Sequence, residues 1–133
     1  MTINALGAAA AKAPEVAAEP AGDAAAVSAA SYLFRSLGDP TRLAIVWHLA
    51  GAGEHKVVDL TAHLGLAQSS VRGALACLRD CGLAESRPQG RASLWSLTTT
   101  PEIIELLAAA ERLLAATGDR VRLCPNYGDE GCR

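Results

Sequence analysis

The segment over residues 57–81 constrains the fold most, because it places two short helical patterns on either side of a glycine. Apolar residues recur at helical spacing over 57–64, and Gly65 ends that run. A second helical pattern begins at residue 68 or 69 and continues to about Cys81. A short helix, a glycine-containing turn and a second helix form the helix-turn-helix layout. We therefore predict a helix-turn-helix unit in this segment.

A β-hairpin is predicted directly after this unit. Residues 83–87 and 92–97 flank the sequence Pro88-Gln89-Gly90-Arg91, which is rich in turn-forming residues. A hairpin in this place would be a wing beside the second helix of the unit.

Three further helices are expected around this unit. Apolar spacing predicts one over 27–36, and Asp39-Pro40 starts another, since Asp caps a helix and Pro fits its first position. That helix should end near Ala50, before two glycines. A last helix should run from Thr100 to near Gly118. The predicted fold is mainly α with a small β-hairpin, a winged helix-turn-helix of about five helices plus the wing.

Composition divides the chain into three parts. Residues 1–26 are rich in alanine with two prolines, which predicts a disordered tail. Residues 27–118 should form the winged helix-turn-helix domain. The apolar surface of its last helix is wide for one small domain, which predicts a homodimer. Residues 119–133 form a polar C-terminal tail.

Charge and hydropathy exclude several classes of function. The net charge of −2 argues against a general nucleic-acid coat, but residues 68–91 carry four Arg against one Asp and one Glu. No apolar run is long enough to span a membrane, and no signal peptide is recognisable, so we expect a cytoplasmic protein. We find no nucleophile–base–acid set and no phosphate-binding glycine loop, and therefore expect no enzyme.

Cys77 and Cys81 lie one helical turn apart, on one side of the predicted helix and away from its core stripe. Helical neighbours at this spacing are ~5–6 Å apart, too far for a disulfide but suitable for a shared metal ion. The alternative is two small, partly buried apolar residues. Cys124 or Cys132 would supply a third thiolate. Thiolates select soft or borderline ions such as Cd(II), Pb(II), Zn(II), Cu(I) and As(III).

The histidines suggest no competing metal site in the sequence. His48 and His63 fall in predicted helices and His55 in a loop. We interpret each of them as a solvated or core-edge residue.

Three stretches resemble the ArsR/SmtB family of winged-helix metal-responsive repressors: 36-SLGDPTRLAIVWHL-49, 58-VDLTAHLGLAQSSV-71 and 75-LACLRDCGL-83. The resemblance covers roughly residues 30–118. Thiols that some members carry in the third helix are absent here, and so are histidines of the last helix. The cadmium- and lead-sensing actinobacterial branch has C-L-R-x-C-G-L in the second helix of the unit, which this chain matches from Cys77 onward. Cys124 falls close to that branch's third ligand.

The resemblance implies a homodimer that binds a palindromic double-stranded operator without metal and releases it when a soft metal binds. Cd(II) or Pb(II) is the expected inducer, with Zn(II) or As(III) as alternatives. The metal ligands would be Cys77, Cys81 and Cys124, with Cys132 as a further candidate. The expected DNA-binding residues are Gln68, Ser69, Ser70, Arg72 and Gly73 in the helix, and Arg87 and Arg91 in the wing.

Two rival functions use the same residues. A thiol redox switch would respond to oxidant without metal. A winged-helix interaction module would show no salt-sensitive, sequence-selective DNA binding.

Overall fold

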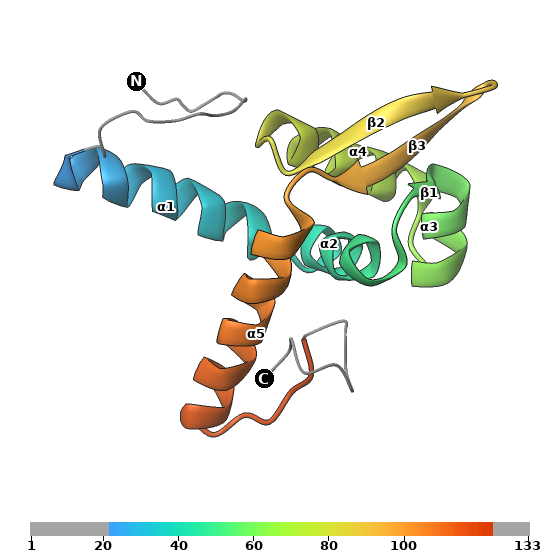
Figure 1. The fold of residues 1–133 in the computed structure, drawn as a ribbon. Helices are drawn as coiled ribbons and strands as arrows, with labels where there is room; N and C mark the ends of the chain where they lie inside the picture. Colours follow the sequence, from blue (N-terminus) through green and yellow to red (C-terminus); the bar gives the residue numbers. More distant parts are fainter. Residues whose placement is uncertain (1–21, 124–133) are drawn as a thin grey trace.

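The computed structural model describes residues 22–123, which form five helices and a small antiparallel sheet (Figure 1). In chain order the elements are α1 (Asp23–Leu37), α2 (Pro40–Ala52), β1 (His55–Lys56), α3 (Val57–Leu64), α4 (Gln68–Asp80), β2 (Ala84–Gln89), β3 (Ala92–Leu97) and α5 (Thr100–Ala116). The predicted helices and hairpin are all present. None of the helices of this described part is long and apolar enough to cross a membrane.

The first helix starts earlier than predicted. It begins at Asp23, so residues 23–26 belong to α1 and not to the predicted tail. These residues are Asp followed by three alanines, and alanine has the highest intrinsic helix propensity. The predicted disorder of residues 1–21 lies outside the described residues.

The predicted start of α2 is confirmed, and the helix ends at Ala52, two residues beyond the predicted end near Ala50. The Asp39 carboxylate accepts a hydrogen bond from the backbone N–H of Arg42 at 3.0 Å, and a proline opens the helix. The helix passes through Gly51, and Gly53 terminates it with φ of 82°. A positive φ is accessible to glycine without steric cost, which makes the second glycine the stronger stop.

The helix-turn-helix boundaries agree with the sequence. Gly65 ends α3 in the left-handed conformation, with φ of 67°. The α4 helix begins at Gln68, and Cys81 follows its last residue as the C-cap. The turn therefore consists of residues 65–67.

The sheet differs from the predicted hairpin in two ways. Strand β2 pairs with β3 from Ala84↔Leu97 to Gln89↔Ala92, so only Gly90 and Arg91 form the tip. The predicted four-residue tip is wrong, because Pro88 and Gln89 continue the strand. Strand β1 also pairs with β3, through His55↔Trp95 and Lys56↔Leu94.

The core lies where α2, α3, α4 and the sheet meet. Val71, Leu75 and Leu78, the predicted core stripe of α4, have no exposed surface. They pack in one cluster with Ile45 and Leu60.

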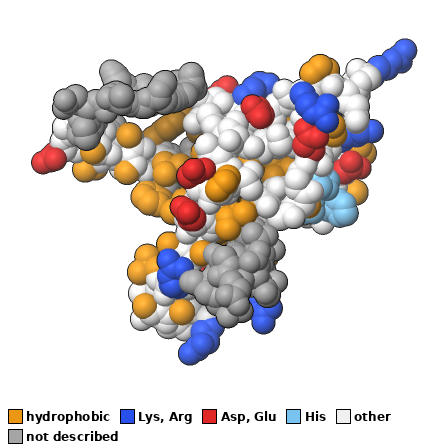
Figure 2. Space-filling view, viewed as in Figure 1, with side chains coloured by type: hydrophobic (Ala, Val, Ile, Leu, Met, Phe, Trp, Pro, Cys, Tyr) orange, Lys and Arg blue, Asp and Glu red, His pale blue; other side chains and the backbone are white. Residues whose placement is uncertain are grey.

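In contrast, α1 and α5 extend away from this core in diverging directions (Figure 1). Large apolar side chains stay exposed on both: Val27, Tyr32 and Phe34 on α1, and Leu113 on α5. Figure 2 shows apolar side chains gathered along these two projections. The described protomer thus leaves two helices only partly packed.

Candidate functional site

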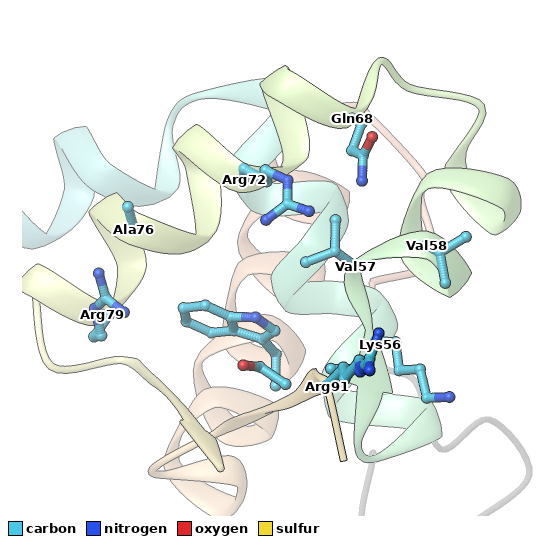
Figure 3. Close-up of a pocket in the computed structure, with 11 residues that line it drawn as sticks. Lys56, Val57, Val58, Gln68, Arg72, Ala76, Arg79 and Arg91 are labelled. Carbon is cyan, nitrogen blue, oxygen red and sulfur yellow. The ribbon is translucent and has the colours of Figure 1, made fainter. Parts of the chain in front are cut away.

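A groove of about 370 Å³ lies between α4, the start of α3 and the wing (Figure 3). Gln68, Arg72 and Arg79 line it from α4, while Lys56 and Arg91 approach from the sheet side. Four of its lining residues are Lys or Arg, and none is Asp or Glu. This groove is therefore a cationic surface on a protein whose net charge is −2.

Trp95 of β3 lines this groove and connects α4 to the sheet. Its ring is mostly buried, and the Arg79 guanidinium carbon lies 5.4 Å from the ring centroid. A guanidinium at this distance over an indole forms a cation–π contact. The contact holds one cation of α4 against strand β3.

The helical part of the predicted DNA-binding set lies on one accessible surface. Gln68, Ser69, Ser70, Arg72 and Gly73 are all exposed in the N-terminal half of α4. Gln68 and Arg72 also line the cationic groove. The helix N-cap is Ala67, which provides no side-chain cap. Backbone N–H groups at such a helix start favour anionic partners.

The two predicted wing arginines have different surroundings. Arg91 lines the groove at the wing tip. Arg87 instead donates two hydrogen bonds to Glu54, with Nε–Oε2 of 2.7 Å and Nη2–Oε1 of 2.8 Å. These hydrogen bonds raise the pKa of Arg87 and lower the pKa of Glu54. The DNA contact of Arg87 stays a prediction, and a phosphate would compete with Glu54 for it.

Lys56 and Arg79 line the groove but were not among the predicted DNA-binding residues. Lys56 is placed there by the pairing of β1 with β3, which the sequence did not reveal. Arg79 could have been found from sequence, because it follows Gln68 and Arg72 at helical spacing.

The two thiols lie near the C-terminal end of α4 on a different face, and neither lines the groove. Cys77 is exposed and Cys81 is half-buried. The Cys81 Sγ lies 3.1 Å from the Oγ of Ser36, a buried residue of α1. Cys81 also raises the pKa of Tyr32 in α1, first through a hydrogen bond and then through its charge. The C-terminal end of α4 is therefore in polar contact with α1.

Cys124 and Cys132 lie outside the described residues, so the predicted third ligand is not placed. Within residues 22–123, neither thiol belongs to a group of three metal-ligating side chains. The thiol site stays a prediction.

The histidines, each interpreted from the sequence as a solvated or core-edge residue, come together in the structure. One ligand atom from each of His48, His55 and His63 lies within 4.8 Å of the other two. Burial, and then the two neighbouring imidazoles, lower the pKa of His48. No local motif marks this cluster, because its members come from α2, β1 and α3.

Comparison with known proteins agrees with this geometry. The model of the bacterial regulatory protein, arsR family, matches residues 39–86, from the start of α2 into β2. A probable mercury resistance operon repressor of Streptomyces lividans is 32% identical over 98 residues, covering 74% of this chain and 77% of that protein. The HTH-type transcriptional regulator CmtR of Mycobacterium tuberculosis is 36% identical over 110 residues, covering 72% and 91%. The chain belongs to the ArsR family.

Solved structures extend this result to the fold. The crystal structure of Rv0081 from Mycobacterium tuberculosis has a TM-score of 0.61 and 30% identity, and covers 73% of this chain and 94% of that one. This ArsR-family protein is thus a winged helix-turn-helix regulator of transcription and not an enzyme. In that fold, α4 is the recognition helix and β2–β3 is the wing.

Proposed function

We propose that this ArsR-family protein is a metal-responsive repressor that acts as a cytoplasmic homodimer. The reduced, metal-free dimer binds a palindromic operator, and a soft metal ion, Cd(II) or Pb(II) in preference to Zn(II) or As(III), releases it. The metal ligands are Cys77, Cys81 and Cys124, with Cys132 as a further candidate. The observation that carries the proposal is that the cationic groove and the thiol pair occupy different faces of the same helix, α4.

The groove supports the DNA-binding half of the proposal. Its cations line a hollow between helix and wing, where they would neutralise phosphates, and the exposed side chains at the start of α4 are free to reach base edges. Gln68, Ser69 and Arg72 are the residues we assign to base contacts.

The partly packed helices support the dimer. Val27, Phe34 and Leu113 expose more than half of their surface on α1 and α5. Apolar surface of this kind on projecting helices is buried when a second copy packs against it. Two copies related by a twofold axis would present two α4 helices to a palindromic site.

The Cys81–Ser36 contact supports a route from metal to DNA. A thiol can donate its proton to the Ser36 hydroxyl, but a metal-bound thiolate can only accept a hydrogen bond. When Cys81 turns toward a metal ion shared with Cys77, its contact with α1 must change. Since α1 is also the helix assigned to the dimer, the change would alter the relative placement of the two recognition helices.

The test is a fluorescence-anisotropy titration of the reduced protein onto the DNA upstream of its own gene, with and without one equivalent of Cd(II) per protomer. A coupling of ~1–3 kcal/mol would weaken DNA binding about 5- to 150-fold. Cys77→Ser, Cys81→Ser and Cys124→Ser should each keep the metal-free affinity and lose the response. Cys132→Ser should show whether this fourth thiol participates.

Two results would contradict the proposal. An affinity unchanged by Cd(II), Pb(II), Zn(II) and As(III) but lowered by oxidant would favour a redox switch, for which Cys77 is sufficiently exposed. Binding that is insensitive to both salt and DNA sequence would favour an interaction module.

A further inference from the structure

All three histidines of the chain lie in one cluster at the corner between α2, β1 and α3. The ring centroids of His48 and His55 are 4.7 Å apart, those of His48 and His63 are 5.0 Å apart, and those of His55 and His63 are 5.7 Å apart. Figure 2 shows the histidine side chains as one pale-blue patch near the wing. Neither Cys77 nor Cys81 is part of this group.

The hydrogen bond made by His55 leaves its other ring nitrogen available as a metal ligand. The Nδ1 of His55 lies 3.2 Å from the carbonyl oxygen of Gly53. A carbonyl only accepts, so Nδ1 must carry the proton and the lone pair is on Nε2. A backbone carbonyl in this role is the usual outer partner of a metal-bound histidine.

The Nε2 of His48 is a second, independent observation. This atom is buried, and it has no hydrogen-bond partner within the described part of the chain. Buried polar atoms are almost always paired, so an unpaired one indicates a missing partner. A cation in the cluster would accept its lone pair.

From these contacts we propose that His48, His55 and His63 form a binding site for a divalent cation of borderline softness, with Zn(II) as its representative. Imidazole suits first-row divalent ions, and three histidines with one open position form a known zinc coordination. Tetrahedral zinc needs nitrogen atoms about 3.3 Å apart, given a Zn–N bond of ~2.0–2.1 Å. The ligand atoms now lie within 4.8 Å of one another. Rotation of the exposed His63 and the half-buried His55 would close the difference.

The site would tie together three elements, of which β1 and α3 also contribute residues to the cationic groove. His55 pairs with Trp95, whose ring holds Arg79, and its neighbour Glu54 holds Arg87 of the wing. His63 lies in the last turn of α3, one residue from its end and close to the turn into α4. A cation bound only by the folded state stabilises it in proportion to the logarithm of its concentration. Zinc should therefore raise the melting temperature and stiffen this corner.

The experiment uses the full chain with all four cysteines replaced by serine, so that thiols contribute no ligands. Zn(II) is titrated in competition with a chromophoric chelator, and the imidazole ¹H–¹⁵N signals are followed by NMR. Because the chain has three histidines, each signal belongs to this cluster. We expect one Zn(II) per protomer, all three imidazoles shifting together, and a higher melting temperature.

Single substitutions decide whether the histidines are the ligands. His55→Gln and His63→Gln should each weaken Zn(II) binding tenfold or more, while circular dichroism shows an unchanged fold. Glu105→Gln, which removes an exposed carboxylate of α5, is the matched control and should leave the affinity unchanged. His48→Gln adds to the series if it folds, and the other two variants suffice if it does not.

The proposal fails if Zn(II) does not bind at one equivalent, if only one imidazole shifts, or if both accessible variants keep the parent affinity. Because the protein tested has no cysteine, these outcomes are independent of the thiol site. If Cd(II) does not release DNA from the native protein, the thiol proposal fails, but Zn(II) binding by the histidines is unaffected.

Discussion

Two faces of α4 differ in the chemistry that surrounds them. One face carries Gln68, Arg72 and Arg79 and borders a groove lined by cations. The other carries two thiols near the C-terminal end of the helix, of which Cys81 contacts α1 through Ser36. The groove face is suited to phosphates and base edges, and the thiol face to soft metals and to a neighbouring helix.

Because both faces belong to one short helix, metal binding by the thiols could change DNA binding at the groove. The buried stripe of Val71, Leu75 and Leu78 fixes both faces of α4 to one core. A rigid helix moves as a unit, so a displacement caused at the thiol face also displaces the groove face, with no need for unfolding. Changes to the shared core should affect both faces, and changes to one face should affect only the chemistry of that face.

The largest effect is expected from the core that both faces share. Leu78 lies between Cys77 and Arg79 in the sequence, and its side chain is fully buried. Leu78→Ala should lower the free energy of unfolding by about 2–5 kcal/mol, because it removes apolar contacts and leaves a cavity. Urea unfolding followed by circular dichroism measures this change. Cys77→Ala, at an exposed position, is the control. An equal loss in the free energy of unfolding of that variant would mean that α4 packs differently.

A smaller effect, confined to the groove, is expected from Arg72→Ala. Under the proposed function Arg72 contacts a base edge, so its loss should weaken operator binding by about 1–3 kcal/mol and relax sequence preference. The factor by which Cd(II) weakens operator binding should stay the same, because the thiols are unchanged. Anisotropy titrations at several salt concentrations measure both. Arg87→Ala is the comparison, and it should cost less because Glu54 already holds that side chain. The reverse order of the two effects would place the DNA contact on the wing.

At the thiol end, Ser36→Ala tests the contact with α1. It removes the hydroxyl that lies 3.1 Å from Cys81 Sγ. A single neutral hydrogen bond contributes about 0.5–1.5 kcal/mol, so the stability loss should be about 1 kcal/mol or less. Metal-free operator affinity should stay near the parent value, while the Cd(II) effect on it shrinks. If Cd(II) acts as strongly on this variant as on the parent, the metal signal does not pass through this contact.

Sequence signals located most of the fold because they are local. Asp39-Pro40 marks the start of α2, Gly65 marks the end of α3, and a buried stripe every three or four residues marks the core face of α4. Each signal depends on neighbours in the chain, so one sequence suffices to read it. The exposure of the N-terminal half of α4 was predicted for the same reason.

Contacts between distant segments were not visible. Strand β1 has two residues, too few for an alternating pattern, and it exists only because β3 pairs with it. That pairing places Lys56 in the groove and His55 beside the other two histidines. The histidines are seven and eight residues apart in sequence, a spacing that matches no metal motif. The packing of α2 against α3 and the pairing of β1 with β3 together bring them into one cluster.

The smallest expected effect concerns the protonation of His48. Burial and two neighbouring imidazoles lower its pKa in the folded state. Below the unfolded value, near 6.5, the unfolded chain then binds more protons than the folded chain. This contribution to stability is complete above about pH 6.5 and decreases as the pH falls toward the folded pKa. With a chelator present, the melting temperature should fall between pH 7 and pH 5, and His48→Gln should reduce that slope. An equal slope in the variant would assign the pH dependence to other groups, and the imidazoles of His55 and His63 would then be tested in the same way.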